Sequence, residues 1–192
     1  MTNLPPLLVL TDRTQCTIPL LSVVGEAVEH GARAVVLREK DLPWPERVAL
    51  AHACHEILAA VGGLVIMAGT RGDAVHLAAT DPVPAPRPSL MGRSCHSAAD
   101  VDVAAREGCA YVTVSPVFPT PSKPGYGPAL GFAGLAALCR SQPPVYALGG
   151  VRPEHVRGCL NAGARGVAVM GPVMREPAIV PSYLAQLKEA AE

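Results

Sequence analysis

The chain has 192 residues, of which 49% are apolar and 17% are charged, and its 16 lysines and arginines balance 16 aspartates and glutamates. This composition predicts one folded domain with a hydrophobic core and excludes an intrinsically disordered chain. A net charge of zero gives no support to binding of nucleic acid or of an anionic membrane. Because no apolar run approaches the roughly 20 residues that span a bilayer, and no signal-peptide pattern is seen, a cytoplasmic protein is expected.

Cysteine and proline are distributed in informative ways. Six cysteines are scattered without a Cys-x-x-Cys pair, so reduced thiols are expected rather than disulfides or structural zinc. Many of the 20 prolines fall in two segments, 82–88 and 116–128. Because proline is poor in the interior of helices and strands, both segments are predicted to be loops.

Eight short runs rich in apolar and β-branched residues recur along the chain. They cover residues 7–11, 34–38, 64–67, 74–77, 90–94, 111–115, 145–148 and 166–170. Nearly continuous apolar runs are typical of parallel strands that are buried on both faces. These runs therefore predict a parallel sheet.

Helical patterns with recognisable ends separate most of the predicted strands. Pro45, Ser97 and Pro153 mark three helix starts, and Ser182 is expected to cap the last helix. The alternation of eight strands with helices predicts a compact (β/α)8 barrel over the whole chain. A doubly wound parallel sheet is the alternative, since strand alternation alone does not separate the two folds.

The connections on either side of the fourth predicted strand are unusual. Only residues 68–73 separate the third strand from the fourth, whereas parallel neighbours normally need about a dozen residues. The helix after the third strand is therefore expected to be missing. The next connection, 78–89, contains the first proline cluster, so its helix is expected to be short or absent.

Polar residues gather where the predicted strands end, which is the face of a barrel that carries active sites. Arg38 and Lys40 share one face of the second strand and suggest an anionic substrate, unless they pair with Glu39 or Asp41. Ser94 and His96 end the fifth strand. A histidine exchanges protons near neutral pH, so His96 is a candidate general acid or base, and a structural role is the alternative. His76 lies inside a strand and is interpreted as a hydrogen-bonded residue of the core or of the barrel mouth.

Two further segments predict anion binding. Gly149 and Gly150 follow the seventh strand, and the eighth ends in Met170-Gly171, the positions at which barrels frequently bind phosphate. The alternative for this glycine pair is a tight turn. The proline-stiffened loop after the sixth strand carries Thr120, Ser122 and Lys123, whose hydroxyls and ammonium suit a phosphate or pyrophosphate.

The order of these motifs resembles the thiamine-phosphate synthase/TenI family. The matching segments are Thr11-Asp12, LREK at 37–40, VHL at 75–77 with Asp81, GRSCHS at 92–97, SPVFPTPSK at 115–123, ALGGV at 147–151 and AGARGVAVM at 162–170. The resemblance covers most of the chain, and it implies a (β/α)8 barrel and a role in thiamine biosynthesis.

The synthase branch implies one set of roles. Its members join an aminopyrimidine pyrophosphate to a thiazole phosphate with Mg²⁺, so Lys40 and the Thr120/Ser122/Lys123 loop would hold the pyrophosphate. The glycines at 149, 150 and 171 would hold the thiazole phosphate, and Asp81 would be the remaining carboxylate for the metal. Two positions depart from that pattern. Val36 replaces a glutamine, and Met67-Ala68 ends the third strand where the synthases carry an Asn-Asp-Arg segment.

The TenI branch implies a thiazole tautomerase, which needs a phosphate site and an acid/base but no metal. His96 would carry the proton and Arg38 would pair with the substrate carboxylate. We favour this activity from the sequence, with the Mg²⁺-dependent synthase and a non-catalytic phosphate-binding barrel as alternatives. The expected partner is a small phosphorylated thiazole. A homodimer is also expected, because a missing helix would leave apolar barrel wall exposed.

Overall fold

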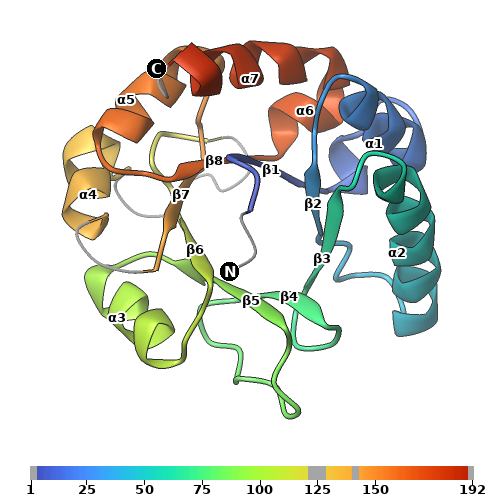
Figure 1. The fold of residues 1–192 in the computed structure, drawn as a ribbon, viewed down its shortest axis with the longest axis horizontal. Helices are drawn as coiled ribbons and strands as arrows, with labels where there is room; N and C mark the ends of the chain where they lie inside the picture. Colours follow the sequence, from blue (N-terminus) through green and yellow to red (C-terminus); the bar gives the residue numbers. More distant parts are fainter. Residues whose placement is uncertain (1–3, 121–128, 140–142, 190–192) are drawn as a thin grey trace.

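The computed structural model describes residues 4–120, 129–139 and 143–189. Within them, eight strands pair in parallel in chain order, and β1 also pairs with β8, so the sheet closes into a barrel (Figure 1). The strands are β1 (Leu7–Leu10), β2 (Ala34–Leu37), β3 (Leu64–Ala68), β4 (Ala74–Leu77), β5 (Leu90–Cys95), β6 (Tyr111–Val114), β7 (Val145–Leu148) and β8 (Gly166–Val169). The predicted (β/α)8 barrel is confirmed, and the doubly wound sheet, which has free edges, is excluded.

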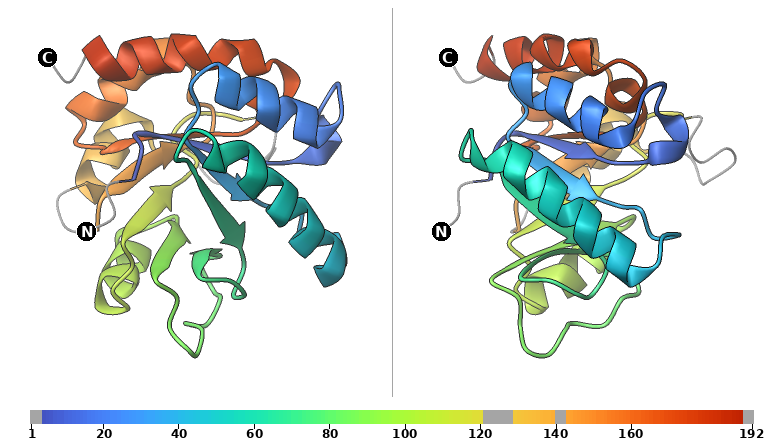
Figure 2. Two further views of the ribbon diagram at one scale, coloured as in Figure 1. Left: turned by 45° about the vertical axis from the view of Figure 1, so that its right-hand side comes forward. Right: turned by 90° about the vertical axis from the view of Figure 1, so that its right-hand side faces the viewer.

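Helices form a partial outer ring around the strands (Figures 1 and 2). They are α1 (Leu20–Glu29), α2 (Trp44–Ala59), α3 (Ala98–Arg106), α4 (Gly131–Leu138), α5 (Val156–Asn161), α6 (Gly171–Arg175) and α7 (Val180–Glu189), with 3₁₀ turns at Arg13–Gln15, Pro153–His155 and Pro177–Ile179. None of the helices within the described ranges is long and apolar enough to cross a membrane.

The sequence signals for helix starts are mostly confirmed. Pro45 lies in the first turn of α2, and the Ser97 hydroxyl accepts a hydrogen bond from the Asp100 amide at the start of α3. The cap expected at Ser182 is wrong. The chain enters α7 at Val180 directly from the 3₁₀ turn at Pro177–Ile179, so Ser182 lies inside the helix.

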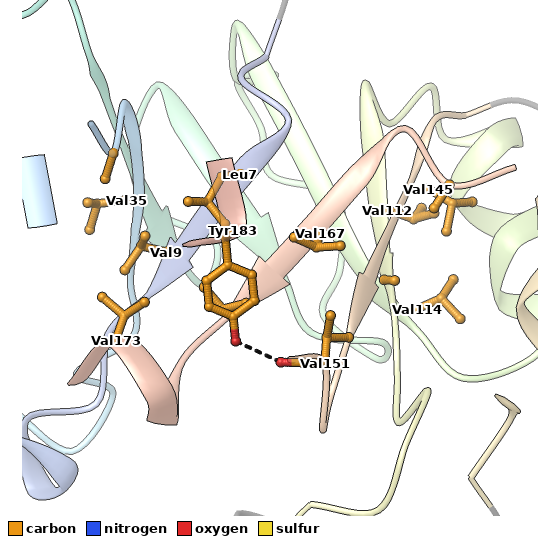
Figure 3. Close-up of a cluster of buried hydrophobic side chains, with 14 of the residues drawn as sticks. Leu7, Val9, Val35, Val112, Val114, Val145, Val151, Val167, Val173 and Tyr183 are labelled. Atoms are coloured by element: carbon orange, nitrogen blue, oxygen red, sulfur yellow. Dashed lines mark hydrogen bonds between the residues drawn. The ribbon is translucent and has the colours of Figure 1, made fainter. Parts of the chain in front are cut away.

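Side chains alternate between two cores along each strand. The inner core fills the barrel with residues such as Leu8, Val36 and Tyr111. The outer core lies between strands and helices and includes Leu7, Val9, Val35, Val112, Val114, Val145 and Val167 (Figure 3). Within this outer core, the Tyr183 hydroxyl of α7 donates a hydrogen bond to the Val151 carbonyl at 2.9 Å. Successive side chains of a strand point to opposite faces, so every second residue reaches the barrel interior.

The link from β3 to β4 contains no helix, as predicted. Gly69 and Gly72 turn the chain with φ of +112° and +131°, values that residues with a side chain rarely adopt. The Gly69 amide then donates to the His76 carbonyl at 2.9 Å. β4 pairs in parallel with β3 through Met67–Val75 and Ala68–His76.

The proline-rich connection 78–89 also contains no helix and runs along the outside of β4 and β5 (Figure 2). Val83 from this connection packs against the outer core. Val75 and Leu77, which face outward on β4, are fully buried although no helix follows this strand. The exposed barrel wall that led us to expect a homodimer is therefore absent, because a loop covers it.

Arg93 fastens this connection to the barrel. Its buried guanidinium donates from Nη1 to the carbonyls of Ala78, Ala79 and Asp81 at 2.9–3.0 Å. Its Nη2 forms an ion pair with Glu107 at 2.5 Å. One side chain on the outer face of β5 thus holds the loop where a barrel helix would otherwise pack.

Candidate active site

A cavity of about 440 Å³ opens at the carboxyl ends of the strands. Its lining residues are Leu10, Arg38, Lys40, Ala68, His76, Ala78, Ala79, Ser94, His96, Ser115, Pro116, Pro119, Thr120, Leu148, Gly149, Gly150, Val151, Arg152, Ala168, Val169, Met170, Gly171, Pro172 and Arg175. A cavity of this size, with an apolar floor and a polar rim, is typical of sites that bind small molecules. The position agrees with the predicted location of function in a barrel.

The two-residue alternation of the strands positions the polar rim. On β2 the inward series passes from Ala34 and Val36 to Arg38 and Lys40. This series is apolar inside the barrel and polar once it passes the last strand residue. Val36 is fully buried in the inner core and does not line the cavity, so the polar part of β2 begins at Arg38.

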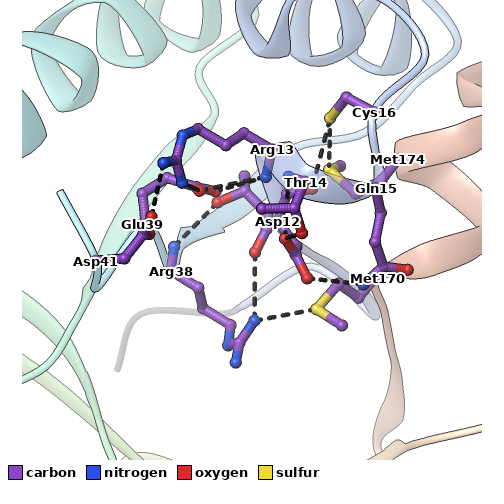
Figure 4. Close-up of polar contacts among 11 residues, drawn as sticks. Asp12, Arg13, Thr14, Gln15, Cys16, Arg38, Glu39, Asp41, Met170 and Met174 are labelled. Atoms are coloured by element: carbon purple, nitrogen blue, oxygen red, sulfur yellow. Dashed lines mark hydrogen bonds and ion pairs between the residues drawn. The ribbon is translucent and has the colours of Figure 1, made fainter. Parts of the chain in front are cut away.

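The cations of β2 are not neutralised by their neighbouring carboxylates. Glu39 and Asp41 instead form ion pairs with Arg13, at 3.4 and 2.6 Å (Figure 4). The Arg38 guanidinium turns the other way, toward the cavity. Arg38 and Lys40 therefore remain available to an anionic ligand, and the alternative of pairing within this segment is wrong.

Four side-chain cations line the cavity, and no carboxylate is found among its described lining residues. Arg152 and Arg175 join Arg38 and Lys40, although the sequence analysis did not single them out. The segment 121–128, which lies outside the described residues, contains neither aspartate nor glutamate in its sequence. The site is strongly cationic within a chain of zero net charge, which favours a ligand with more than one anionic group.

Gly149 and Gly150 have no room for a side chain. Their φ values are +90° and +65°. A β-carbon on Gly150 would approach the carbonyl oxygens of Pro119 and Phe118 to 2.5 and 2.7 Å. The loop after β6 is held in this position because the Phe118 amide donates to the Gly149 carbonyl at 2.9 Å. The glycine pair thus allows two backbone segments to meet at the rim of the cavity.

Gly171 begins α6 directly beneath the Arg175 guanidinium. A β-carbon on Gly171 would lie 2.8 Å from both Arg175 Nη1 and Gln15 Oε1. Gln15 accepts from Arg175 at 3.0 Å and donates to the Asp12 carboxylate at 2.7 Å. Met170, just before Gly171, contacts Arg38 through its sulfur at 3.1 Å (Figure 4). The predicted phosphate segment therefore lies next to a guanidinium that the alternation pattern does not reveal.

His96 lines the cavity at the end of β5. Its Nδ1 lies 2.6 Å from the Ser115 carbonyl oxygen, and its backbone amide donates to Asp100 Oδ2 at 2.8 Å. Because a carbonyl only accepts hydrogen bonds, Nδ1 carries the hydrogen and the lone pair of the neutral ring is on Nε2. A ring fixed in this tautomer is suited to accept a proton.

His76 is also part of the cavity wall, in line with its interpretation from the sequence as a core or mouth residue. It is buried on β4, with Nδ1 3.0 Å from the Tyr111 hydroxyl and Nε2 3.0 Å from Ser94 Oγ. Burial, aided by the positive charges of Lys40 and Arg38, lowers the pKa of His76 to about 3. The imidazole is therefore neutral at physiological pH.

The residues present do not fit a protein-held Mg²⁺. Asp81 is not among the lining residues, and its carboxylate accepts a hydrogen bond from the Ala78 amide at 2.8 Å. Across the described residues, no group of three His, Cys, Asp or Glu side chains is arranged to hold a metal. Magnesium prefers carboxylate oxygens, and this cavity offers cations in their place.

The remaining predicted residues are divided between the cavity and the undescribed loop. Thr120 lines the cavity, whereas Ser122 and Lys123 lie outside the described residues. Ser115, a lining residue on the inward series of β6, was not singled out from the sequence. Because every second residue of a strand faces inward, as Arg38 and Lys40 do, the sequence alone could have placed Ser115 and His76 at the cavity. Arg152 and Arg175 follow β7 and β8 and are not given by this alternation.

The chain is similar to several known proteins over most of its length. The sequence profile of the thiamine monophosphate synthase family matches residues 7–173. A thiamine-phosphate synthase of Roseiflexus castenholzii is 32% identical over 185 residues, covering 88% of this chain and 81% of that protein. One from Methanoculleus marisnigri is 35% identical over 178 residues, covering 85% of this chain and 82% of that protein.

Among solved structures, the thiamine phosphate pyrophosphorylase of Pyrococcus furiosus superposes with a TM-score of 0.84 at 26% identity, over 97% of this chain and 96% of that chain. The resemblance drawn from the sequence motifs is thus confirmed over nearly the whole chain. The protein therefore belongs to the thiamine monophosphate synthase family of thiamine biosynthesis.

Proposed function

We propose that the protein is a thiamine-phosphate synthase that joins an aminopyrimidine pyrophosphate to a thiazole phosphate. The observation that carries the proposal is the cationic cavity, whose candidate anion-binding residues come from two parts of the barrel. Arg38 and Lys40 follow β2, while Gly150, Gly171 and Arg175 follow β7 and β8. Each region serves one phosphorylated substrate, and the names of the family relatives support the same reaction.

The reaction requires charge stabilisation more than side-chain chemistry. The bond between the pyrimidine methylene and the pyrophosphate oxygen breaks, and its electron pair leaves with the pyrophosphate. The thiazole nitrogen then forms a bond to the methylene carbon. Arg38 and Lys40 offset the charge that grows on the leaving group, and the glycine segments hold the thiazole phosphate so that its nitrogen faces the methylene.

A thiazole tautomerase is the second candidate, and one observation favours it. His96 is fixed with its neutral lone pair on Nε2 by the 2.6 Å contact to the Ser115 carbonyl. This arrangement suits transfer of a proton between two atoms of a thiazole ring without a metal. The sequence favours this activity, but the relatives compared above carry the synthase name, so we place it second.

Two assays on the purified protein separate these activities. In the first, both synthase substrates are supplied with Mg²⁺ and thiamine phosphate is measured. In the second, the thiazole carboxylate phosphate tautomer is supplied alone and its aromatisation is measured. We expect turnover in the first assay and a loss of at least tenfold in kcat/KM for Lys40→Gln.

Lys188→Gln on the outer helix α7 is the matched control and should leave both assays unchanged, because Lys188 is exposed and does not line the cavity. Turnover only in the second assay would replace the synthase by the tautomerase. Tight binding of thiazole phosphate with no turnover in either assay would assign a non-catalytic binding barrel.

A further inference from the structure

A chain of hydrogen-bonding groups leads from the barrel interior to the cavity wall. It starts at the Tyr111 hydroxyl, passes through the His76 ring and ends at the Ser94 hydroxyl, with both contacts at 3.0 Å. Thr113 Oγ1 also lies 3.3 Å from His76 Nε2. Ser94 and His76 line the cavity, whereas Tyr111 and Thr113 are fully buried.

Tyr111 determines the direction of the hydrogen bonds. Its hydroxyl has no other hydrogen-bond partner in the part of the chain that the structure describes. The ring has no freedom to move toward Gly92, where even a β-carbon would overlap it. If His76 Nδ1 carried the hydrogen, the hydroxyl hydrogen of Tyr111 would remain unpaired in the core. The arrangement that satisfies both groups has Tyr111 donating to Nδ1, which leaves the hydrogen on Nε2.

The tautomer of His76 then determines what Ser94 offers to a ligand. An Nε2–H group donates to Ser94 Oγ, so the serine hydrogen is left to point into the cavity. In the opposite tautomer Ser94 would donate to Nε2 and present only lone pairs to the cavity. In this tautomer Thr113 Oγ1, at 3.3 Å from Nε2, accepts the weaker part of the hydrogen bond that Nε2 donates to Ser94 Oγ at 3.0 Å.

We propose that Tyr111 and His76 are positioning residues that fix Ser94 as a hydrogen-bond donor, so that this wall of the cavity selects an acceptor nitrogen of the aminopyrimidine ring. The groups that this wall offers are themselves uncharged, namely the His76 imidazole and the Ser94 hydroxyl, whereas the four cations among the described lining residues project from the segments that follow β2, β7 and β8. A hydroxyl donor on such a wall suits a neutral acceptor. The identity of this substrate rests on the proposed function, whereas the direction of the hydrogen bonds does not.

The first test measures the tautomer directly and needs no substrate. Protein labelled with ¹⁵N-histidine is examined at neutral pH by long-range ¹H–¹⁵N correlation, and the His76 signals are assigned from their loss in His76→Gln. We expect an Nε2-protonated ring. A ring protonated on Nδ1 would overturn the proposal, whatever reaction the protein catalyses.

The second test measures selection of the acceptor. The aminopyrimidine pyrophosphate is compared with two analogues in which one ring nitrogen at a time is replaced by C–H. With the unaltered protein, one analogue should lose about tenfold in kcat/KM, the usual effect of one unmatched hydrogen bond. Ser94→Ala should show that loss with the normal substrate and no further loss with the analogue. If Ser94→Ala and the unaltered protein distinguish the normal substrate from the analogue equally well, Ser94 does not select the substrate.

Tyr111→Phe tests the relay, and Tyr146→Phe is its matched control. Both tyrosines are buried in the inner core and their rings pack edge to face at 5.7 Å. The Tyr146 hydroxyl donates instead to the Pro5 carbonyl at 3.0 Å. We expect Tyr111→Phe to reduce discrimination between the substrate and the analogue, and Tyr146→Phe to leave it unchanged. Absence of turnover in every protein would reject the proposed function, and the tautomer measurement would still decide the relay.

Discussion

The Ser115 carbonyl and the His96 ring are joined by a 2.6 Å contact that fixes the histidine tautomer from the neighbouring strand. This contact leads to a prediction that separates the two candidate reactions. His96→Gln should lower tautomerase turnover by about 10²- to 10⁴-fold, the usual range for loss of a general acid or base. It should lower synthase turnover by less than tenfold, because that reaction needs no proton transfer at this position.

Turnover and melting temperature are measured on the same His96→Gln preparation. His55→Gln, an exposed histidine on α2, is the control and should change neither quantity. A lower melting temperature with unaltered turnover per folded molecule would assign His96 a structural role only.

Two glycines in different surroundings, Gly150 after β7 and Gly25 inside α1, predict opposite effects of substitution by alanine. Gly150→Ala should lower stability by about 1–3 kcal/mol, because its φ of +65° and the nearby carbonyls leave no place for a β-carbon. It should also raise KM for thiazole phosphate by about tenfold or more. Gly25→Ala, inside α1 with nothing within 4 Å of the added carbon, should raise stability by roughly 0.5–1 kcal/mol. Thermal unfolding and steady-state kinetics measure both, and an unchanged KM for Gly150→Ala would argue against phosphate at this position.

The position of Asp81 predicts how the protein responds to magnesium. Calorimetric titration of the substrate-free protein with Mg²⁺ should show no binding, since the lining residues that the structure describes supply no carboxylate. Asp81→Asn should leave the Mg²⁺ dependence of turnover within about twofold, because the asparagine oxygen still accepts from the Ala78 amide. A tenfold increase in the Mg²⁺ concentration required would show that Asp81 is a metal ligand.

The Arg93–Glu107 pair predicts unequal effects on stability. Arg93→Met should cost about 3 kcal/mol of unfolding free energy, because it leaves Glu107 and three loop carbonyls without their cation. Glu107→Gln should cost less, since the Arg93 guanidinium keeps its three carbonyl acceptors and the Glu107 side chain is 28% exposed. Urea unfolding of both variants provides the comparison, and equal losses would contradict it.

The buried His76 predicts a dependence of stability on pH. Its pKa is about 3 in the folded protein, mainly because of burial with help from Lys40, Arg38 and Arg93 against an opposing Asp81, and its ordinary value is 6.5. Between these values the unfolded chain binds the proton that the folded protein excludes. The contribution of His76 is therefore complete above pH 6.5 and is lost as the pH falls, at no more than roughly 1.4 kcal/mol per pH unit. His76→Gln should show a shallower slope of stability between pH 6 and pH 4, and an identical slope would contradict the prediction.

The fold was predictable because the apolar runs and the helix-start signals agree. The predicted strands 74–77 and 145–148 match β4 and β7 residue for residue, and the other predictions differ by one residue at the carboxyl end. Where the prediction runs one residue too long, at Thr11, Arg38 and Ser115, these residues make hydrogen bonds that involve side chains: the Arg38 amide donates to the Thr11 hydroxyl, and the Ser115 carbonyl contacts the His96 ring.

The site residues that lie at the end of a strand were predictable from the sequence. Arg38, Lys40, Ser94 and His96 follow directly from the strand ends. Arg175 depends on the turn into α6 and on its contact with Gln15, 160 positions away, which no local pattern contains. The loop cover of β4 was missed for the same reason, because it depends on three carbonyls that converge on one buried guanidinium.

The absence of helices on both sides of β4 has a consequence for the dynamics of the protein. A strand whose connections are loops opens at a lower free energy than strands that helices cover, so its backbone amides exchange with solvent sooner. His76 lies on this strand, and its ring contributes to the cavity wall. A ligand held by that wall favours the closed form and slows exchange along β4. Amide exchange in this one strand therefore reports occupancy of the cavity without any assay of turnover.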